Sequence, residues 1–317
     1  MARYLVTGGA GFIGSRMVRR LLERGDTAVV LDDLSTGFRE NVPPGAEFVQ
    51  GDLADPAVWE GLSPEGVDAV LHLGAQSSGE VSHEDPLRDF DVNARGSLLL
   101  LGWCERHGVR RLLHASSMAV YGNSDRPSAE DAPKRPGSFY GASKLAAEGY
   151  ITLFARRGGA PTVFRLFNVY GPGQNLGNLK QGMVSIYMAY LLDGEPVLVK
   201  GSLDRFRDFV YVDDVVDAWM AALARPETAG ETYNLASGRR TTVRELLDGL
   251  LAAFGRAGED RVVQGEGTAG DIAGSVADIS KIRRELEWSP KTELREGLGR
   301  MVRWARERRG ASAREDV

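Results

Sequence analysis

Short apolar runs alternate with longer stretches of helical periodicity through the first half of the chain. The apolar runs predict strands and the longer stretches predict helices. The predicted strands are residues 3–7, 27–31, 47–50, 68–73, 110–115 and 161–166. The predicted helices are residues 13–24, 87–107 and 138–157. Strands that alternate with helices form βαβ units, so the pattern predicts an α/β fold with a Rossmann-type, doubly wound parallel sheet that binds ligands at the carboxyl ends of its strands.

The pattern changes after Gly171, where an irregular segment rich in glycine and asparagine covers residues 172–182. The predicted strands beyond it are residues 196–200 and 209–212, and the predicted helices are residues 184–192, 214–224, 243–254, 278–286 and 293–309. This second half predicts a smaller α/β domain on the C-terminal side. We expect residues 311–317 to form a disordered tail.

A glycine-rich turn follows the first predicted strand, with Gly8, Gly11 and Gly14 at intervals of three residues. Phe12 and Ile13 lie between the last two glycines, where the first helix begins. Such glycines let the backbone approach a pyrophosphate closely at a helix N-terminus, which predicts a dinucleotide site. A plain tight turn between strand and helix is the alternative.

Acidic residues close the second and third predicted strands. Asp32, with Asp33 beside it, ends the second strand 18 positions after Gly14. A carboxylate there accepts hydrogen bonds from a ribose 2′-hydroxyl and repels a 2′-phosphate, which favours NAD over NADP. Asp52 and Leu53 follow the third strand and suit the adenine edge, although a helix N-cap is the alternative for Asp52.

Tyr140 and Lys144 are four residues apart at the start of a predicted helix, so they share one face. The ammonium, together with a positive nicotinamide ring, favours the phenolate, and we expect the pKa of Tyr140 to fall from about 10 toward neutrality. The result is a general base for a sugar hydroxyl. Ser117 ends the preceding strand and can hold the same hydroxyl. An exposed helix face is the alternative for the Tyr140–Lys144 pair.

Composition limits the classes of protein that fit. Of the 317 residues, 43% are hydrophobic and 26% are charged, which is typical of a globular protein, and the net charge of −5 argues against a nucleic-acid surface. No apolar run approaches the roughly 20 residues of a membrane span. The first strand begins at Arg3 and leaves no room for a signal peptide, so we expect a cytoplasmic protein. The single cysteine, Cys104, and histidines without ligand spacing predict no metal site.

Several motifs occur in a fixed order along the chain. They are Gly8–Gly14, Asp32, Asp52-Leu53, Asn93, Ser116–Gly122, Tyr140 with Lys144, Arg165–Gly171 and Arg207–Val212. Together they resemble the extended short-chain dehydrogenase/reductases, in particular the NAD-dependent nucleotide-sugar epimerase/dehydratase family with its UDP-glucose (UDP-galactose) 4-epimerases. The resemblance covers nearly the whole chain, and it implies NAD as the cofactor and a nucleotide sugar as the substrate.

The resemblance also implies a role for each matching residue. Ser117, Tyr140 and Lys144 would be the catalytic residues. Besides the glycine turn and the acidic residues, NAD would contact Leu73, Gly74, Ala75, Asn93, Tyr140 and Lys144. The substrate would contact Ser82, Ser117, Met118, Tyr140, Asn168, Asn178, Leu179, Arg207 and Asp271. Thr268 replaces the arginine that the family carries three residues before Asp271, so Arg205 or Lys180 would have to supply that phosphate contact.

Structural alternatives stand beside two of these interpretations. The guanidinium of Arg207 suits bidentate binding of a phosphate, with an ion pair to Asp204 or Asp208 as the alternative. His72 lies in an apolar strand, and we expect it to be a hydrogen-bonded core histidine with no catalytic role.

The implied reaction is epimerisation at C4 of a UDP- or dTDP-hexose through a transient 4-keto sugar, with NAD regenerated in each cycle. A 4,6-dehydratase would need an acid/base pair after the catalytic serine, and a UDP-glucuronate decarboxylase would need a glutamate there. Met118 and Ala119 occupy these positions and cannot transfer a proton. A UDP-glucuronate 4-epimerase remains an alternative. A non-catalytic NAD-binding regulator would be expected to lose Tyr140 or Lys144.

We expect an NAD-binding domain over residues 1–168 and about 206–237, and a nucleotide-sugar-binding domain over residues 169–205 and 238–310. The segment Leu98–Cys104 is apolar on every side, so one face would pack on the sheet. The other face would meet a second copy of the chain. We therefore expect a homodimer that pairs helices near residues 97–107 and 138–157, as in dimers of the family.

The carboxylate at position 32 predicts the choice of cofactor. We expect the protein, stripped of nucleotide, to bind NAD more tightly than NADP, because Asp32 repels a 2′-phosphate and the next arginine, Arg39, is seven residues on. Isothermal titration calorimetry with each nucleotide measures this preference. Tighter binding of NADP would contradict the role given to Asp32.

Overall fold

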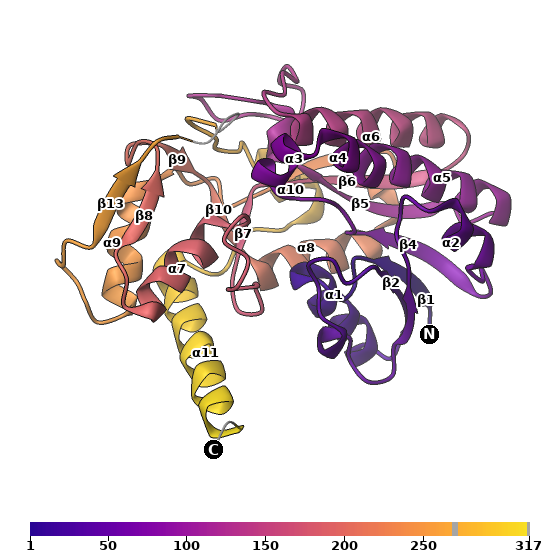
Figure 1. Cartoon of the computed structure of the whole chain (residues 1–317). Coiled ribbons are helices and arrows are strands. Elements are labelled where there is room, and N and C mark those ends of the chain that lie inside the picture. Colours follow the sequence, from indigo (N-terminus) through magenta and orange to yellow (C-terminus); the bar gives the residue numbers. More distant parts are fainter. Residues whose placement is uncertain (268–271, 316–317) are drawn as a thin grey trace.

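A parallel sheet of seven strands forms the centre of the computed structural model, which describes residues 1–267 and 272–315 (Figure 1). The strand order is β11-β6-β5-β4-β1-β2-β3. The strands are β1 (Arg3–Thr7), β2 (Thr27–Asp32), β3 (Glu47–Gln50), β4 (Val67–His72), β5 (Arg111–Ser117), β6 (Ala160–Leu166) and β11 (Thr232–Leu235). Apart from β11, this is the 3-2-1-4-5-6 order of dinucleotide-binding sheets. The predicted Rossmann-type, doubly wound sheet is confirmed.

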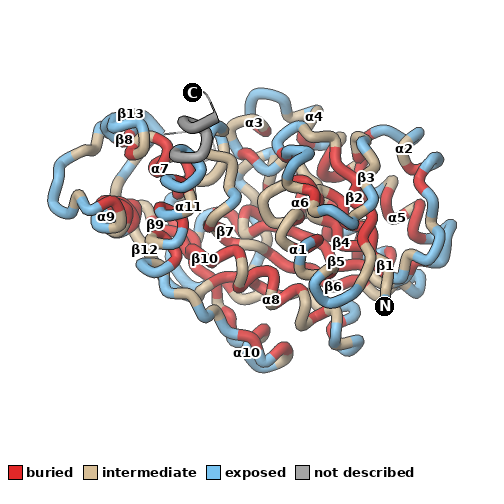
Figure 2. The backbone as a smooth tube through the Cα atoms, turned by 90° about the horizontal axis from the view of Figure 1, so that it is seen from below, coloured by how far each residue is buried: buried red, intermediate tan, exposed pale blue. Residues whose placement is uncertain are grey.

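Helices cover both faces of the sheet, because successive strand residues point to opposite sides. The helices on one face are α1 (Phe12–Glu23), α8 (Val212–Leu223) and α10 (Ser280–Leu286). Those on the other are α2 (Pro56–Gly61), α5 (Gly96–His107) and α6 (Phe139–Arg156). Met17 and Trp219 are buried on the first face, and Trp59 and Phe154 on the second. The strands between the two layers are buried along most of their length (Figure 2).

A smaller lobe has its own apolar core, which includes Tyr187, Leu246 and Met301. Its helices are α7 (Met183–Asp193), α9 (Val243–Ala253) and α11 (Leu294–Glu315). Short strands pair around it: β7 (Asn168–Tyr170) with β10 (Phe209–Tyr211), β8 (Val197–Lys200) with β13 (Val262–Gly265), and β9 (Phe206–Arg207) with β12 (Thr241–Thr242). The helix α11 continues to Glu315, whereas the sequence predicted a disordered tail from residue 311; the alanines and charged residues of this stretch favour a helix.

The single helix predicted over residues 87–107 is divided in the structure. It consists of α4 (Pro86–Phe90), a π-helical turn η2 (Asp91–Arg95) and α5. The short helix α3 (Gly79–Glu84) precedes it and was not predicted. Short 3-10 turns lie at η1 (Arg39–Asn41), η3 (Met118–Val120) and η4 (Pro226–Thr228). From the π turn, Asn93 contacts Ser143 of α6.

A buried ion pair joins the sheet to α6. Nε and Nη2 of Arg165, on β6, lie 2.9 Å and 2.7 Å from the carboxylate oxygens of Glu148, on α6. Only 5% and 10% of the two side chains are exposed, and Ser116 and Tyr121 complete the hydrogen bonds of the pair. Each charge therefore depends on the other, because water does not solvate either one.

We expect Arg165→Met to destabilise the protein by about 3–5 kcal/mol, because it leaves the Glu148 carboxylate buried without its cation. Arg157→Ala is the matched control: Arg157 is 71% exposed and pairs with Glu105 at 3.2 Å, and such a surface pair contributes about 0–1 kcal/mol. Urea denaturation of both variants measures the two losses. Equal losses would show that the buried pair is not a special determinant of stability.

Candidate active site

The glycine turn after β1 packs directly against the loop after β4. Gly8 has a left-handed φ of +69°, and a Cβ there would lie 2.6 Å from the backbone nitrogen of Gly74. A Cβ on Gly14 would lie 2.0 Å from the carbonyl oxygen of Gly8. Gly11 is the N-cap of α1 and supplies no capping side chain, so an anion such as a pyrophosphate fits at this helix end. The helix begins with Phe12 and Ile13.

Asp32 ends β2 and holds the glycine turn in place. Its Oδ2 accepts a hydrogen bond from the Ala10 amide at 2.9 Å, and its Oδ1 accepts one from the Leu34 amide at 2.9 Å. Burial raises the pKa of Asp32, although these hydrogen bonds oppose the rise. The Asp32 carboxylate thus also stabilises the glycine turn, a role that its position in the sequence did not reveal. Each oxygen keeps a further lone pair that a ribose hydroxyl can use.

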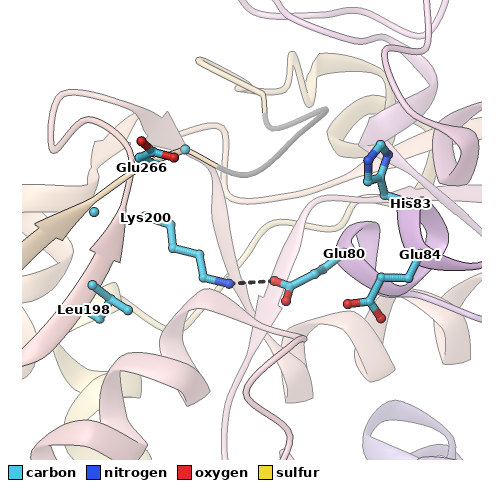
Figure 3. Close-up of a pocket in the computed structure, with 8 residues that line it drawn as sticks. Glu80, His83, Glu84, Leu198, Lys200 and Glu266 are labelled. Atoms are coloured by element: carbon cyan, nitrogen blue, oxygen red, sulfur yellow. Dashed lines mark hydrogen bonds and ion pairs between the residues drawn. The ribbon is translucent and has the colours of Figure 1, made fainter.

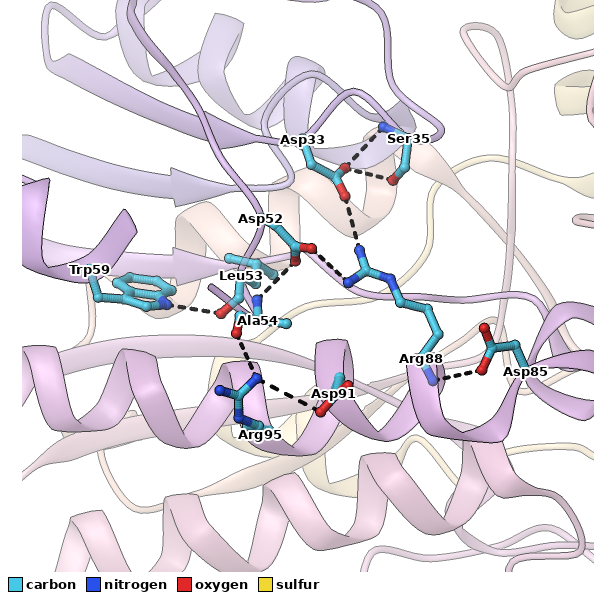
Figure 4. A network of polar contacts seen from close by, with 10 residues as sticks. All are labelled: Asp33, Ser35, Asp52, Leu53, Ala54, Trp59, Asp85, Arg88, Asp91 and Arg95. Atoms are coloured by element: carbon cyan, nitrogen blue, oxygen red, sulfur yellow. Dashed lines mark hydrogen bonds and ion pairs between the residues drawn. The ribbon is translucent and has the colours of Figure 1, made fainter. Parts of the chain in front are cut away.

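Arg88 of α4 lies between Asp33 and Asp52 (Figure 4). Its Nη1 is 2.6 Å from Asp52 Oδ2, and its Nη2 is 3.4 Å from Asp33 Oδ2. Burial would raise the pKa of Asp52, but hydrogen bonds from Arg88 and the Ala54 amide lower it overall. Sequence reasoning missed Arg88, because it stands 36 positions from Asp52 and belongs to no motif. Asp33 and Asp52 thus balance the charge of Arg88 at the carboxyl ends of β2 and β3, where the adenosine of NAD is expected.

The N-cap alternative for Asp52 is wrong. Asp55 is the N-cap of α2, and its carboxylate accepts a hydrogen bond from the Ala57 amide at 2.9 Å. Leu53 is buried, and its carbonyl accepts a hydrogen bond from Trp59 Nε1 at 2.9 Å. Asp52 therefore stands before the helix, at the carboxyl end of β3.

Ser117 ends β5, while Tyr140 and Lys144 lie in the first turns of α6. The hydroxyl of Ser138 caps this helix by accepting an amide of the first turn at 3.1 Å. Lys144 Nζ donates to the carbonyl of Ala115 at 2.8 Å, and the Ser117 hydroxyl accepts a hydrogen bond from the Ala119 amide at 3.2 Å. The fold thus brings a hydroxyl, a phenol and a buried ammonium to the carboxyl end of one strand.

The pKa of Tyr140 lies above its ordinary value. Burial raises it to about 12, the hydrogen bond with Ser117 lowers it, and the charge of Asp89 raises it. Burial also lowers the pKa of Lys144 to about 8, against the charges of Asp89 and Glu148. The predicted fall in the pKa of Tyr140 also involves the positive nicotinamide ring, so it stays a prediction for the complex with NAD, and the protein groups alone raise this pKa.

Asn93 lies in η2 and connects two neighbouring segments. Its Nδ2 is 2.9 Å from the carbonyl of Gln76 and 3.1 Å from the hydroxyl of Ser143 on α6. The residues Leu73, Gly74 and Ala75 follow β4. The Gly74 amide donates to Thr7 Oγ1 at 3.1 Å, which fixes this loop to the end of β1.

The prediction for His72 is confirmed. Its Nδ1 is 2.7 Å from Thr7 Oγ1 and its Nε2 is 3.0 Å from Ser97 Oγ, and the ring is buried. Burial lowers the pKa of His72 to about 3, so the ring is neutral at physiological pH.

The residues expected on the substrate side come from both lobes. Ser82 is buried on α3, and Met118 begins the η3 turn directly after Ser117. Asn168 begins β7, and its Nδ2 donates to a main-chain carbonyl 3.2 Å away. Asn178 and Leu179 lie in the loop before α7, where Leu179 is 48% exposed. Thr268 and Asp271 lie outside the described residues.

Arg207 is buried on β9. Its Nη1 donates to the carbonyl of Phe206 at 2.9 Å, and burial together with the charge of Arg205 lowers the pKa of Arg207 to about 10. The carboxylate of Asp208 accepts hydrogen bonds from the hydroxyl and the amide of Ser237, at 2.6 Å and 2.8 Å.

A pocket of about 410 Å³ opens between α3 and the strand pair of β8 and β13 (Figure 3). It is lined by Glu80, His83, Glu84, Leu198, Lys200, Gly265, Glu266 and Gly267. Lys200 Nζ is 2.9 Å from Glu80, so one ion pair connects the two walls, and Lys180 Nζ, from the loop before α7, is 2.7 Å from Glu84. Lys180, an expected phosphate contact, is thus engaged by a glutamate.

Neither a metal centre nor a membrane span is found in the part of the chain that the structure describes. Its histidine, cysteine and acidic side chains do not gather in threes that could hold a metal ion. None of its helices is both long enough and apolar enough to cross a membrane.

Comparison with known proteins gives one consistent family. Residues 4–236 match the NAD dependent epimerase/dehydratase family. A putative UDP-glucose 4-epimerase of Methanocaldococcus jannaschii is 36% identical over 303 residues, which are 95% of this chain and 97% of that protein. The structure of a UDP-glucose 4-epimerase from Thermotoga maritima, solved with UDP-glucose, is 37% identical with a TM-score of 0.92, covering 96% of this chain and 99% of that one.

A protein with another reaction is also similar. The structure of a dTDP-glucose 4,6-dehydratase from Streptomyces venezuelae, solved with NAD, is 34% identical with a TM-score of 0.90, covering 97% of this chain and 98% of that one. Proteins that are similar over nearly the full length of this chain therefore include enzymes named for different reactions. The matched residues 4–236 contain the glycine turn, Ser117, Tyr140 and Lys144. The chain belongs to the NAD-dependent epimerase/dehydratase family of extended short-chain dehydrogenase/reductases.

Proposed function

We propose that the protein is an NAD-dependent epimerase that inverts C4 of a UDP- or dTDP-hexose through a transient 4-keto sugar. One observation carries the proposal: Ser117 ends β5, and Tyr140 and the buried Lys144 share the first turns of α6, while Met118 and Ala119 follow Ser117 without any titratable group. The site can therefore move the proton of one hydroxyl, and it holds no acid at these two positions to expel a second one.

The residues around the glycine turn fit NAD. Its pyrophosphate would lie at Gly8, Gly11, Phe12, Ile13 and Gly14, its adenosine at Asp32, Asp33, Asp52 and Leu53, and its nicotinamide end at Leu73, Gly74, Ala75, Asn93, Tyr140 and Lys144. The support is the close backbone packing of Gly8 and Gly14 at the N-terminus of α1, where a side chain has no room. When bound, NAD supplies the hydride acceptor and donor for C4.

Tyr140 would take the proton of the 4-hydroxyl and return it to the 4-keto sugar. Ser117 would hold the same oxygen by a hydrogen bond. The pKa of Lys144, about 8, leaves most of the ammonium protonated at pH 7. Together with the positive nicotinamide ring of bound NAD, that charge would favour the Tyr140 phenolate against the effect of burial. Lys144 therefore acts through its charge, held in place by the Ala115 carbonyl.

The sugar nucleotide would lie between the two lobes. We assign to it Ser82, Ser117, Met118, Tyr140, Asn168, Asn178, Leu179, Arg207 and Asp271. Arg207 is the cation for the diphosphate, because its guanidinium is buried and its lowered pKa, about 10, still leaves it charged at neutral pH. The similar epimerase structure with UDP-glucose supports UDP as the nucleotide.

The two residues after Ser117 distinguish the related reactions. A 4,6-dehydratase or a decarboxylase requires a proton-transferring side chain there, and this chain has Met118 and Ala119. A UDP-glucuronate 4-epimerase would share the residues proposed here, so a panel of UDP- and dTDP-sugars decides the substrate.

The whole-protein arrangement belongs to the same proposal. The NAD-binding domain comprises residues 1–168 and about 206–237, and the nucleotide-sugar-binding domain comprises residues 169–205 and 238–310. We place the enzyme in the cytoplasm, where nucleotide sugars would be its substrate pool.

We expect a homodimer through α5 and α6, because Leu98 and Leu153 on these helices are 50% and 53% exposed. In light scattering at micromolar concentration, the double variant Leu98→Glu and Leu153→Glu should shift the dimer to a monomer. Val263→Glu, at a 51% exposed position on β13, is the control and should leave the dimer unchanged. A wild-type monomer would overturn this interface.

With a substrate deuterated at C4, we expect the label to be found at C4 of the epimer. The reason is that the hydride leaves and returns at the same carbon. Nuclear magnetic resonance of the chromatographed product locates the label. Label at C6, with a 6-deoxy-4-keto sugar as the main product, would instead identify a dehydratase and refute the epimerase.

A separate test of the base uses Tyr140→Phe, which keeps the aromatic ring and removes the phenolic hydroxyl. Turnover should fall by roughly 10²–10⁴-fold, the usual loss for a general base, while substrate binding is largely kept. Full turnover in this variant would assign the proton transfer to another group.

A further inference from the structure

The substrate loop, which we define as residues 175–182, precedes α7 and carries Asn178 and Leu179. Leu176 within the loop and Met183 directly after it pack against the apolar core of the smaller lobe. Between these two anchors, residues 177–182 are half-buried or exposed. The core therefore fixes the ends of the loop, and the middle of the loop depends on polar contacts for its position.

Polar contacts join the middle of the substrate loop to α3, which follows β4 of the seven-stranded sheet. Lys180 Nζ lies 2.7 Å from each of the two carboxylate oxygens of Glu84. The buried hydroxyl of Ser78 donates to the main-chain carbonyl of Lys180 at 2.6 Å. The same hydroxyl accepts a hydrogen bond from the Val81 amide at 3.2 Å, as the N-cap of α3. One group thus joins the start of α3 to the loop.

Further hydrogen bonds reach the side-chain amide of Asn178. Gln181 Nε2 donates to Ser77 Oγ at 2.5 Å, and Gln181 Oε1 accepts a hydrogen bond from Asn178 Nδ2 at 3.3 Å. Asn178 Oδ1 accepts a hydrogen bond from the Lys180 amide at 3.1 Å. Both ends of the Asn178 amide are therefore oriented by Lys180 and Gln181, and each of these two residues contacts the segment around α3.

A second ion pair crosses between the lobes beside the first. Glu80 and Glu84 are four residues apart on α3, so they share one face of this helix. Lys200 Nζ of β8 lies 2.9 Å from Glu80 (Figure 3). The four side chains of the two pairs are between 27% and 52% exposed, and each pair is weak by itself. Together with Ser78, the two pairs place α3 against both the substrate loop and β8.

These contacts bear on the role of Lys180, which the sequence suggested as a phosphate contact. Because both oxygens of Glu84 lie close to Nζ, the charge of Lys180 is balanced within the protein. A contact with the diphosphate would require the ammonium to leave Glu84, while Ser78 holds the main chain of Lys180 in place. The diphosphate already has an assigned cation in the buried Arg207.

We propose that α3 positions the substrate loop: Glu84 and Ser78 hold Lys180, and through it Asn178, in the arrangement that binds the sugar nucleotide. Glu84 and Lys180 are thus positioning residues, and Lys180 does not touch the diphosphate. The proposal rests on the proposed function for its substrate, and a measurement on the loop tests the contact without turnover.

Hydrogen–deuterium exchange of the NAD-loaded protein, without a nucleotide sugar, measures how firmly the loop is held. Glu84→Gln removes one charge and leaves the sequence of the loop unchanged. We expect a peptide covering residues 175–182 to exchange roughly two- to fivefold faster in this variant, the range that an exposed ion pair supplies. Lys291→Gln is the matched control, because Lys291 pairs with Asp217 of α8 at 2.9 Å, outside α3 and the loop. Exchange in Glu84→Gln at the wild-type rate would overturn the proposal.

The direction in which KM changes distinguishes the two roles of Lys180. In Glu84→Gln we expect KM for the nucleotide sugar to rise by about two- to fivefold, with kcat unchanged because Ser117, Tyr140 and Lys144 are untouched. A direct contact predicts a fall in KM, since the loss of the Glu84 charge frees the ammonium for the diphosphate. A fall in KM would therefore refute the positioning role. An unchanged KM beside faster exchange would show a merely structural contact and would refute it as well.

Reversal of both charges provides a rescue. Glu84→Lys and Lys180→Glu each place like charges in contact, and each alone should raise KM further than Glu84→Gln does. The double variant restores an ion pair and should return both KM and the exchange of the loop to nearly the wild-type values. If the double variant keeps the raised KM of Lys180→Glu, position 180 acts on the substrate directly and the proposal fails.

Circular dichroism and thermal unfolding establish that each variant folds, and we expect no loss because both side chains lie at the surface. Should a reversal variant misfold, the direction of the KM change in Glu84→Gln decides the proposal. If Glu84→Gln accelerates the exchange of the loop but the wild type epimerises no nucleotide sugar, the contact between α3 and the loop stands and the proposed function fails.

Discussion

The close backbone approach at the carboxyl ends of β1 and β4 is the constraint from which the site is built. Side chains on Gly8 or Gly14 would overlap main-chain atoms of neighbouring segments, so the turn has a single usable geometry. Asp32 and Thr7 then tie the turn and the loop after β4 together with hydrogen bonds. Because α1 starts from this turn, its N-terminus faces the edge where β4 and β5 end. The phenol and the ammonium of α6 reach the same edge from the opposite layer.

Charge burial is the second constraint, and ion pairs balance several of the buried or partly buried charges. Arg165 and Glu148 compensate one another between the sheet and α6. Arg88 is shared by carboxylates that follow two different strands. Among the described residues, no carboxylate forms an ion pair with Lys144, and burial lowers the pKa of Lys144 to about 8 against the charges of Asp89 and Glu148. The ion pairs of Arg165 and Arg88 thus connect segments of the fold. The ammonium of Lys144 has weaker charge compensation, and it lies where proton transfer is proposed.

Periodicity and motif spacing predicted the sheet, the glycine turn and the residues on α6, because these features depend on local sequence. They did not predict Arg88, since it reaches the site only through the placement of α4. The division of the helix over residues 87–107 was also missed, because a π turn has no compositional signature. The rise in the pKa of Tyr140 that burial causes in the protein alone was not predicted, since burial is a tertiary property. Contacts between segments therefore set the chemistry that spacing alone suggested.

The π turn between α4 and α5 has a consequence for how this region can change in length. Such a turn accommodates one residue more than a regular helical turn. Deleting one residue from Asp91–Arg95 would restore unbroken helical hydrogen bonding, but it would rotate α4 against α5 by roughly 100°. Leu100 and Trp103 could then stay in the core only if Arg88 left its carboxylates. The deletion of one residue is therefore excluded from this segment, in which Val92, Asn93 and Ala94 are buried.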